Sequence, residues 1–546
     1  ARLSSGALRW SGAHAVPYIV SWRRCFLKSE VAVPASSGEA AQLNIPVPGP
    51  NFPCISIAFC RKSVYNPYLA AQSGRRERLR DSGGSDMGLF RQPSGDITSG
   101  VIWKQLLAFF FPLWLGTFFQ QLYNTVDTLV VGRLVGKTAL AAVGAIAVVV
   151  NLTVGLFTGL ASGAVVVIAQ HFGARRGEEV HKAVHTSMLL SILSGAVFTV
   201  AGFLLTPWAL EALGTTEDVM GEATLYLRIY FLGMVPNLIY NMGTSVLRAI
   251  GDSRRPLLFL IAASLCNIVL DLAFVALFHW DVAGVAIATV ASQVLSAVLV
   301  LLSLTRAQGD PYQFFPRKMY IYGDTLLATL RIGVPAALQS LMYSISNLVI
   351  QAAINSFGTD TMAAWAAYSK VDVLFWMTLN AMSLALTTFA GQNYGAGEYG
   401  RLKKSVWISS GMIAVFTVAI SFLLTFFSRP VLSIFVREEE TAVLALGEEM
   451  IRFLVPFYIT YILVELLPGA IRGAGKSMVP MVISLFGICV IRLVWLFAVV
   501  PSHHTVQVVM ASYPITWIVT TVAMLAYYFW GRWLTPQAQL QAQPGK

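Results

Sequence analysis

The residues of this chain that could carry out chemistry are a few charged and polar side chains inside long apolar segments. Asp127 lies deep in one such segment, and Tyr123 stands four residues earlier, on the same face of a helix. Asn267 and Asp271 are also four residues apart and share a face of another segment. A charge at the centre of a bilayer is costly, so it usually faces a cavity or a partner. We therefore interpret these residues as a candidate functional site; the alternative is that each Asp only makes a packing hydrogen bond.

The composition places these segments in a lipid bilayer. The mean hydropathy is +0.66 and 12% of the residues are charged, whereas a soluble domain carries about 25%. Apolar runs of about 20 residues recur, each long enough to cross a bilayer as a helix. They predict an all-α polytopic membrane protein with twelve transmembrane helices, at 103–130, 139–170, 183–207, 222–247, 256–279, 282–305, 325–352, 361–390, 405–428, 446–471, 478–500 and 507–531.

The membrane part of the sequence contains an internal repeat. Gln170-His171-Phe172-Gly173-Ala174 returns as Gln392-Asn393-Tyr394-Gly395-Ala396, and the segment 247–253 returns as 471–477. Six spans per repeat mean that both halves enter the membrane from the same side, which predicts two parallel six-helix repeats. Homologous halves that face each other create an interface at mid-membrane, where transporters bind substrate and rock one half against the other.

The charged loops indicate the orientation. Lys and Arg concentrate in the even-numbered connections, whereas the odd-numbered ones are acidic at 217–218 and 438–440. This asymmetry predicts that both termini are cytoplasmic. The net charge of +11 is then largely a matter of topology, and because the basic residues are spread over many loops they do not form a nucleic-acid patch.

The predicted domains are an N-terminal extension at 1–86, an N-lobe at 87–305, a cytoplasmic linker at 306–324, a C-lobe at 325–532 and a C-terminal tail at 533–546. The extension contains none of the 16 Met residues and shows no sustained periodicity. We expect that translation begins at Met87 and that the upstream residues are not native; the alternative is a genuine disordered basic tail.

Several motifs recur at fixed places in the spans. The first span reads Pro112, then Gln120-Gln121-Leu122-Tyr123-Asn124-Thr125-Val126-Asp127, and the second ends in Gln-His-Phe-Gly-Ala. The fourth ends in Leu-Arg-Ala-Ile-Gly-Asp-Ser, and the fifth contains Asn267-Ile268-Val269-Leu270-Asp271. Over roughly residues 100–532 the chain resembles the MATE family of multidrug and toxic compound extrusion antiporters, and most of all its bacterial DinF-like branch. The resemblance implies a V-shaped, two-lobed exporter of the bacterial inner membrane.

The resemblance also implies the chemistry of the N-lobe. It places Tyr123, Asp127, Asn267 and Asp271 in a cation-coupling site, which Asn241 could complete. Two carboxylates held together in a low-dielectric pocket favour the uptake of a proton. Na⁺ could instead bind the same oxygens, because hard cations select carboxylate, amide and hydroxyl ligands. We therefore expect H⁺ or Na⁺ as the coupling ion, in exchange for a small organic compound that is cationic or amphipathic.

The C-lobe departs from the NorM-like branch of the family. Its seventh span has no acid around Gln339, and Tyr461 stands about where an Asp is expected in the tenth span. The C-lobe has a polar set of its own, which we interpret as lining or gating a substrate cavity: Lys370, Asp372, Glu465, Gln339 and Trp376. We expect Lys370 and Glu465 to form an ion pair, either functional or static, and Arg492 to be a packing or interfacial residue.

The sequence shows no metal-ligand spacing, no disulfide framework, no nucleophile–base set and no ATPase domain. We expect a protein that is not an enzyme, carries no cofactor, acts as a monomer and is driven by an ion gradient. Its partners would be a drug-like substrate, the coupling cation and the lipid bilayer. The first alternative is a lipid-linked oligosaccharide flippase of the same superfamily, which would usually add spans and a strongly cationic cavity. The second is a membrane-embedded enzyme, against which the long-range repeat argues.

Overall fold

The computed structural model describes residues 42–45, 55–58, 97–212 and 214–534. The chain divides into two compact units, Ala1–Arg91 and Gln92–Lys546. In the first, β1 (Gln42–Ile45) pairs antiparallel with β2 (Ile55–Ala58). The predictions for the extension 1–86 and for most of the tail 533–546 otherwise fall outside the described residues.

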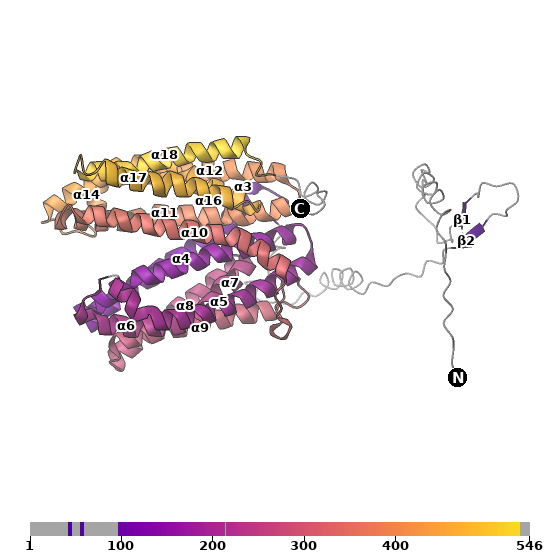
Figure 1. Ribbon diagram of the computed structural model, residues 1–546, viewed down its shortest axis with the longest axis horizontal. Helices are drawn as coiled ribbons and strands as arrows, with labels where there is room; N and C mark the ends of the chain where they lie inside the picture. Colours follow the sequence, from indigo (N-terminus) through magenta and orange to yellow (C-terminus); the bar gives the residue numbers. More distant parts are fainter. Residues whose placement is uncertain (1–41, 46–54, 59–96, 213, 535–546) are drawn as a thin grey trace, which may run out of the picture. The chain divides into compact units, whose positions relative to one another are not determined.

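The second unit is helical (Figure 1). Its first half consists of α3 (Ile102–Val130), η1 (Val131–Val135), α4 (Lys137–Gly173), α5 (Gly177–Ala212), α6 (Glu217–Leu232), α7 (Met234–Ala249), α8 (Arg254–Leu272), η2 (Ala273–Leu277) and α9 (Asp281–Thr305). A connection that contains η3 (Pro316–Lys318) leads to the second half: α10 (Gly323–Asn355), α11 (Thr359–Gly395), α12 (Tyr399–Phe426), α13 (Ser428–Leu432), α14 (Thr441–Leu454), η4 (Val455–Phe457), α15 (Tyr458–Gly473), α16 (Met478–Ser484), η5 (Leu485–Val490), α17 (Ile491–Ala498) and α18 (Val506–Trp530).

The helices match the predicted twelve spans, with one difference. In the part of the chain that the structure describes, 11 helices are long and apolar enough to cross a membrane. The remaining span, predicted at 222–247, consists of α6 and α7, which are 16 residues each and meet at Gly233. Pro236 lacks the N–H that would donate a hydrogen bond to the carbonyl of Leu232. The helix is therefore interrupted between these two residues, at Gly233. The second half has the same break, where η4 with Pro456 joins α14 to α15.

The internal repeat is visible in the helix bounds. From α4 to α11 both the first and the last residue shift by 222 positions, from Lys137 to Thr359 and from Gly173 to Gly395. From α9 to α18 both ends shift by 225 positions. Two homologous six-span bundles follow, here called the N-lobe (α3–α9) and the C-lobe (α10–α18).

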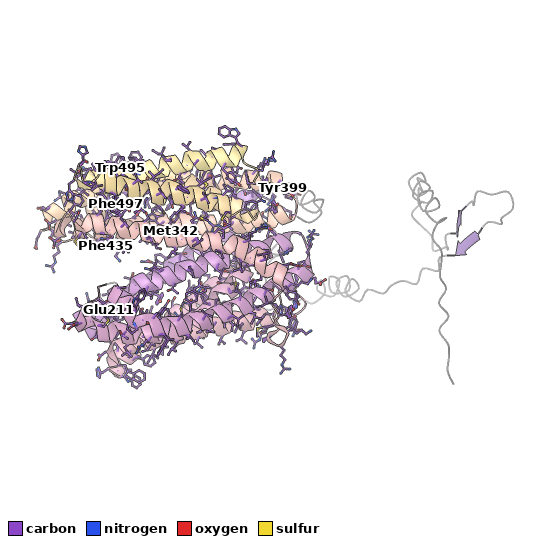
Figure 2. All side chains as sticks on the ribbon, viewed as in Figure 1. Glu211, Met342, Tyr399, Phe435, Trp495 and Phe497 are labelled. Atoms are coloured by element: carbon purple, nitrogen blue, oxygen red, sulfur yellow. The ribbon has the colours of Figure 1, made fainter. Side chains whose placement is uncertain are left out.

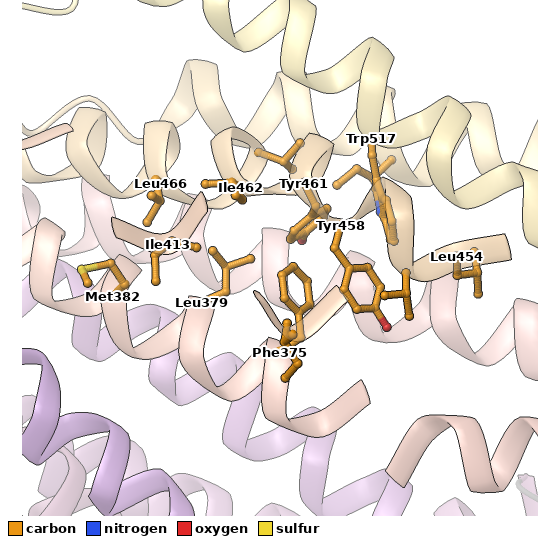
Figure 3. Close-up of a cluster of buried hydrophobic side chains, with 14 of the residues drawn as sticks. Phe375, Leu379, Met382, Ile413, Leu454, Tyr458, Tyr461, Ile462, Leu466 and Trp517 are labelled. Atoms are coloured by element: carbon orange, nitrogen blue, oxygen red, sulfur yellow. The ribbon is translucent and has the colours of Figure 1, made fainter. Parts of the chain in front are cut away.

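Each lobe has its own apolar interior and an apolar outer surface. The C-lobe core includes Phe375, Tyr458 and Trp517, drawn in Figure 3, and the N-lobe core includes Val184 and Leu247. Outward-facing side chains are also apolar; Phe497, labelled in Figure 2, is 74% exposed. An apolar exterior around a packed interior is what a lipid environment requires. The protein is therefore a multi-pass membrane protein.

The lobes meet along α4, which packs against both α10 and α11 of the C-lobe. Small residues permit this approach. A Cβ at Gly159 would lie 2.3 Å from Cα of Ala337, and one at Gly163 would lie 2.3 Å from the carbonyl oxygen of Thr329. Close packing of backbones at glycines is the usual way for membrane helices to associate.

At one end of the helices, the two repeated Gln-x-x-Gly motifs contact each other reciprocally. A Cβ at Gly173 would lie 2.0 Å from the carbonyl oxygen of Gln392, and one at Gly395 would lie 1.9 Å from that of Gln170. The Gln170 side chain donates to the carbonyl of Gly473 at 2.8 Å, and the Gln392 side chain donates to the carbonyl of Ala249 at 2.8 Å. The lobes are thus joined tightly at this end, which is called the closed end below.

Gly159 provides a test of the α4–α10 crossing, with Gly155 one turn earlier as a matched control. A Cβ at Gly155 would meet Cβ of Ser340 at 3.8 Å, an ordinary van der Waals contact. We expect Gly159→Ala to lower the free energy of unfolding by about 1–3 kcal/mol, the usual cost of overpacking, and Gly155→Ala to be neutral or stabilising. Melting temperatures of the purified variants in detergent measure this difference. Equal melting temperatures would contradict the crossing.

Candidate functional site

The structure brings the two predicted N-lobe carboxyl groups together. α3 packs along α8, so Asp127 on α3 comes to face Asp271 on α8. The two groups lie close enough that a proton on one would hydrogen-bond it to the other. Asp271 is 0% exposed and Asn267, one turn earlier, is 1% exposed. Two carboxyl groups that can share a proton in this way form a single ionisable unit.

The same site contains several buried polar atoms without a hydrogen-bond partner. Among the described residues, no hydrogen-bond partner reaches Oδ1 of Asp127, either carboxylate oxygen of Asp271, the side-chain oxygen or nitrogen of Asn267, or Oε1 of Gln293. Buried polar atoms are nearly always paired in folded proteins. A group of oxygens that lacks donors can be satisfied by protons or by a hard cation.

Tyr226 interacts electrostatically with both carboxyl groups and belongs to a polar network that the sequence analysis did not single out. Tyr226 of α6 hydrogen-bonds Thr289 of α9, and Tyr230 hydrogen-bonds Asn237 of α7. Gln293 lies one turn beyond Thr289. The signal that could have found them is their spacing, because Tyr226 and Tyr230 are four apart, like Thr289 and Gln293. That is the spacing of the Tyr123–Asp127 and Asn267–Asp271 pairs.

Asn241 joins this network at its edge. Its side-chain nitrogen donates to the backbone carbonyl of Asn237 at 2.9 Å and to Oδ1 of Asn237 at 2.6 Å. Asn237 in turn bonds Tyr230. Asn241 therefore connects to the carboxylates through Asn237 and the tyrosines rather than by contacting them directly.

Segments of π-helix adjoin the charged residues of the site. The π-helical η1 begins four residues after Asp127, and η2 begins two residues after Asp271. In the C-lobe, η5 ends two residues before Arg492. Single π-helical turns are rare and frequently mark functional sites, because the extra residue shifts side chains from the ordinary helical register.

The C-lobe contains a cavity of about 430 Å³. Three of the predicted C-lobe residues, Asp372, Trp376 and Glu465, line it. Both carboxylate oxygens of Asp372 are occupied, since the Tyr458 hydroxyl donates to Oδ1 and the Trp376 indole donates to Oδ2. The Tyr368 and Tyr458 hydroxyls form a hydrogen bond, with their oxygens 3.0 Å apart. Asp372 is thus the centre of an aromatic hydrogen-bond network.

Gln339 does not line this cavity and belongs to a buried polar network. Its side-chain nitrogen donates to the Tyr343 hydroxyl at 3.1 Å and to Oγ of Ser484 at 3.0 Å, and its oxygen accepts from Arg472 at 3.4 Å. Arg472 also interacts electrostatically with Glu465. Gln339 therefore supports the residues of the cavity through Tyr343 instead of lining it.

The predicted ion pair between Lys370 and Glu465 is wrong. Lys370 lines a separate cavity against α3, together with Gln121, Asn124 and Arg133, while Glu465 lines the C-lobe cavity and has Arg472 as its electrostatic partner. The two residues line different cavities, and sequence spacing along two separate helices does not determine which cavity each of them meets. Arg492 was predicted to be a packing or interfacial residue, and because it is 3% exposed it fits the first of these alternatives.

The family comparison matches one segment in each of the two halves. The sequence model of the MatE family matches residues 112–273 and 335–497. A probable multidrug resistance protein YoeA of Bacillus subtilis is 28% identical over 437 residues, which are 78% of this chain and 93% of that protein. A FAD transporter of Shewanella oneidensis is 25% identical over 345 residues, which are 62% of this chain and 75% of that protein.

Solved structures share the fold. A MOP superfamily transporter from Pyrococcus furiosus aligns with a TM-score of 0.75 at 23% identity, over 81% of this chain and 97% of its own. A multidrug resistance MATE family transporter in an outward-facing conformation aligns with a TM-score of 0.74 at 23% identity, over 83% of this chain and 99% of its own. The twelve-helix, two-lobed architecture predicted from the sequence is confirmed.

Because Lys370 and Glu465 lie apart, their substitutions are expected to act independently. The stability changes of Lys370→Ala and Glu465→Gln should add in the double variant to within about 0.5 kcal/mol. Asp372→Asn and Tyr458→Phe share a hydrogen bond and should not add, which makes this pair the positive control. Thermal unfolding of the six variants in detergent measures both cycles. A coupling energy between Lys370 and Glu465 as large as that of the control pair would contradict their separation and support the predicted ion pair.

Proposed function

The chain belongs to the MatE family of membrane transporters, and on that premise we propose that it exports small organic compounds in exchange for H⁺ or Na⁺. The coupling site is the N-lobe cluster of Tyr123, Asp127, Asn267 and Asp271, with Asn241 at its edge. The observation that supports this assignment is the set of buried carboxylate and amide oxygens without donors around Asp127 and Asp271. Such a set is costly in lipid unless a cation or protons occupy it in part of the cycle.

The coupling ion acts on helix α3, which contacts both lobes. α3 packs against α8 of the N-lobe and α11 of the C-lobe, and the Trp114 indole donates to Oγ1 of Thr378 at 2.9 Å. Protonation of the carboxyl pair, or Na⁺ binding to it, removes a repulsion between α3 and α8. A ligand shifts such an equilibrium only by its different affinities for the two states, so the ion favours the arrangement in which α3 and α8 are closest.

The substrate class follows from the relatives and from the interior of the protein. Relatives are named as multidrug resistance proteins, and we extend that role to this chain. Trp376, Asp372 and Glu465 line a cavity with aromatic walls, which suits amphipathic compounds of varied shape. The protein acts as a monomer in a bacterial inner membrane, with both termini and the closed end on the cytoplasmic side.

The decisive experiment is drug-stimulated ion flux in proteoliposomes. Purified protein is reconstituted, and an imposed H⁺ gradient or Na⁺ gradient is applied separately while a fluorescent amphipathic compound is followed. Uptake driven by one of the two gradients supports antiport and identifies the ion. Uptake that ignores both gradients would refute the proposed coupling.

Asp127→Asn is expected to abolish coupled export while expression stays nearly normal. Neutral Asn fills a similar volume and desolvates at lower cost than a carboxylate, so folding should not suffer. The matched control is Asp218→Asn, an exposed Asp at the start of α6, which should export like the parent protein. Drug resistance of cells that carry each variant is the measurement. Full resistance with Asp127→Asn would rule out its role.

The pH dependence of substrate binding separates the two ions. If protons compete with substrate for the carboxyl pair, affinity measured without Na⁺ should weaken on acidification through one transition, because the protonated pair favours the state with lower affinity for substrate. Asp271→Asn should flatten this curve. An unchanged affinity from about pH 5.5 to 8.5, together with strict dependence on added Na⁺, would assign the coupling to sodium.

A further inference from the structure

The C-lobe cavity contains a buried arginine that lacks a carboxylate partner. Arg492 is 3% exposed and lines the cavity. Its Nη1 lies 3.5 Å from Oγ of Ser346 and its Nη2 lies 3.4 Å from Oγ1 of Thr516, both long contacts to neutral hydroxyls. Its Nε has no hydrogen-bond partner among the described residues. A buried charge held in this way is costly unless an anion compensates it.

Neither acidic group of the cavity forms an ion pair with this arginine. Asp372 accepts hydrogen bonds from Tyr458 and Trp376, and Glu465 interacts with Arg472 and hydrogen-bonds Ser383. None of the ion pairs between described residues includes Arg492. The guanidinium group therefore has unused donor capacity at the wall of a cavity.

Aromatic rings form the walls next to this arginine. The guanidinium lies 4.3 Å from the ring centroid of Tyr513. The Trp517 ring lies 5.5 Å from that of Tyr513 and 5.4 Å from that of Tyr461, and both contacts are edge-on. Figure 3 shows Trp517 and Tyr461 side by side on neighbouring helices. Rings in this arrangement can pack against a planar guest.

The arginine is not a part of the shared architecture of the two halves. The helix that carries it repeats α8 at an offset of 224 residues, as Gly251 and Gly475 do, and this offset places Arg492 opposite Ile268. The same fold is therefore built without a charge at this position. The place of Arg492 needs an explanation specific to the C-lobe cavity.

We propose that the C-lobe cavity binds an aromatic carboxylate. The carboxylate accepts from the guanidinium fork of Arg492, a geometry that favours two parallel hydrogen bonds, and the ring packs among Tyr461, Tyr513 and Trp517. A volume of about 430 Å³ lies within the usual range of small-molecule sites. This proposal rests on the proposed function and deepens it, because it names a substrate class for the same cavity; binding itself needs no ion gradient.

Three probes with one ring system and different charges test the proposal. They are 1-naphthoate, the neutral 1-naphthalenemethanol and the cationic 1-naphthylmethylammonium, titrated into purified protein by calorimetry. We expect the anion to bind more tightly than the alcohol, and the cation to bind least. A cation that binds more tightly than the anion would overturn the proposal, because Asp372 and Glu465 would then set the charge preference.

Variants of Arg492 test whether it causes the preference for the anionic probe. Arg492→Gln should weaken naphthoate binding by about ten- to a hundredfold, as expected for charge-assisted hydrogen bonds, and leave the alcohol unchanged. Arg492→Lys should recover part of the loss, because it keeps the charge but not the fork. Unchanged naphthoate affinity in Arg492→Gln refutes the site. The ranking of the three probes on the parent protein tests the proposal even if Arg492→Gln does not fold.

A control variant and a control condition separate this site from the proposed function. Arg452→Gln removes a C-lobe arginine that pairs with Glu448 at the surface, and it should bind naphthoate like the parent protein. Binding is measured at one pH and without an ion gradient, so naphthoate can bind normally even if gradient-driven flux fails. Loss of naphthoate binding in Arg452→Gln would count against the Arg492 site, whereas a failure of the flux experiment alone would count against the antiport.

Discussion

The contact on which the rest of the structure depends is the reciprocal approach of two backbone segments at the closed end. Gly173 lies against the carbonyl of Gln392, and Gly395 lies against the carbonyl of Gln170. Each glutamine also donates to the carbonyl that ends a helix of the other half, at Gly473 and Ala249. The repeat supplies both halves of this contact, so a duplicated sequence is sufficient to join the two lobes symmetrically.

A joint at one end determines how the polar sites can communicate. Asp271 stands 17 residues after the start of α8, about 25 Å along the axis at 1.5 Å per residue, and α8 starts near the closed end. No side chain spans that distance. Any coupling between the carboxyl pair and the lobe contact must therefore pass through movement of whole helices. α3 is suited to this because it carries Asp127 and packs on both lobes.

Much of this could be predicted from the sequence. Apolar runs and the repeated Gln-x-x-Gly motifs were sufficient for the spans and the two lobes, and a charge in an apolar helix was sufficient to select Asp127 and Asp271. Pro236 indicates an interruption of the span 222–247, but hydropathy alone does not show whether a proline bends a helix or divides it, as it does at Gly233. Lys370 and Glu465 were wrongly paired, since spacing gives the face of each residue on its own helix but not the rotation of one helix against another. The burial of Arg492 depends on that same rotation, so spacing left a packing and an interfacial position open for it.

The two lobes share a fold but differ in the charge that they bury. The position of Asp271 corresponds, at an offset of 224, to Trp495, and that of Arg492 corresponds to Ile268. A buried charge is tolerated in lipid only where a cavity or a partner meets it, so each substitution requires its own polar surroundings. The N-lobe provides oxygens for a cation, and the C-lobe provides hydroxyls and aromatic rings around a guanidinium. After duplication, opposite charges in equivalent helices allow one fold to hold two chemically different sites. A single lobe could not hold both, because the two opposite charges would neutralise each other.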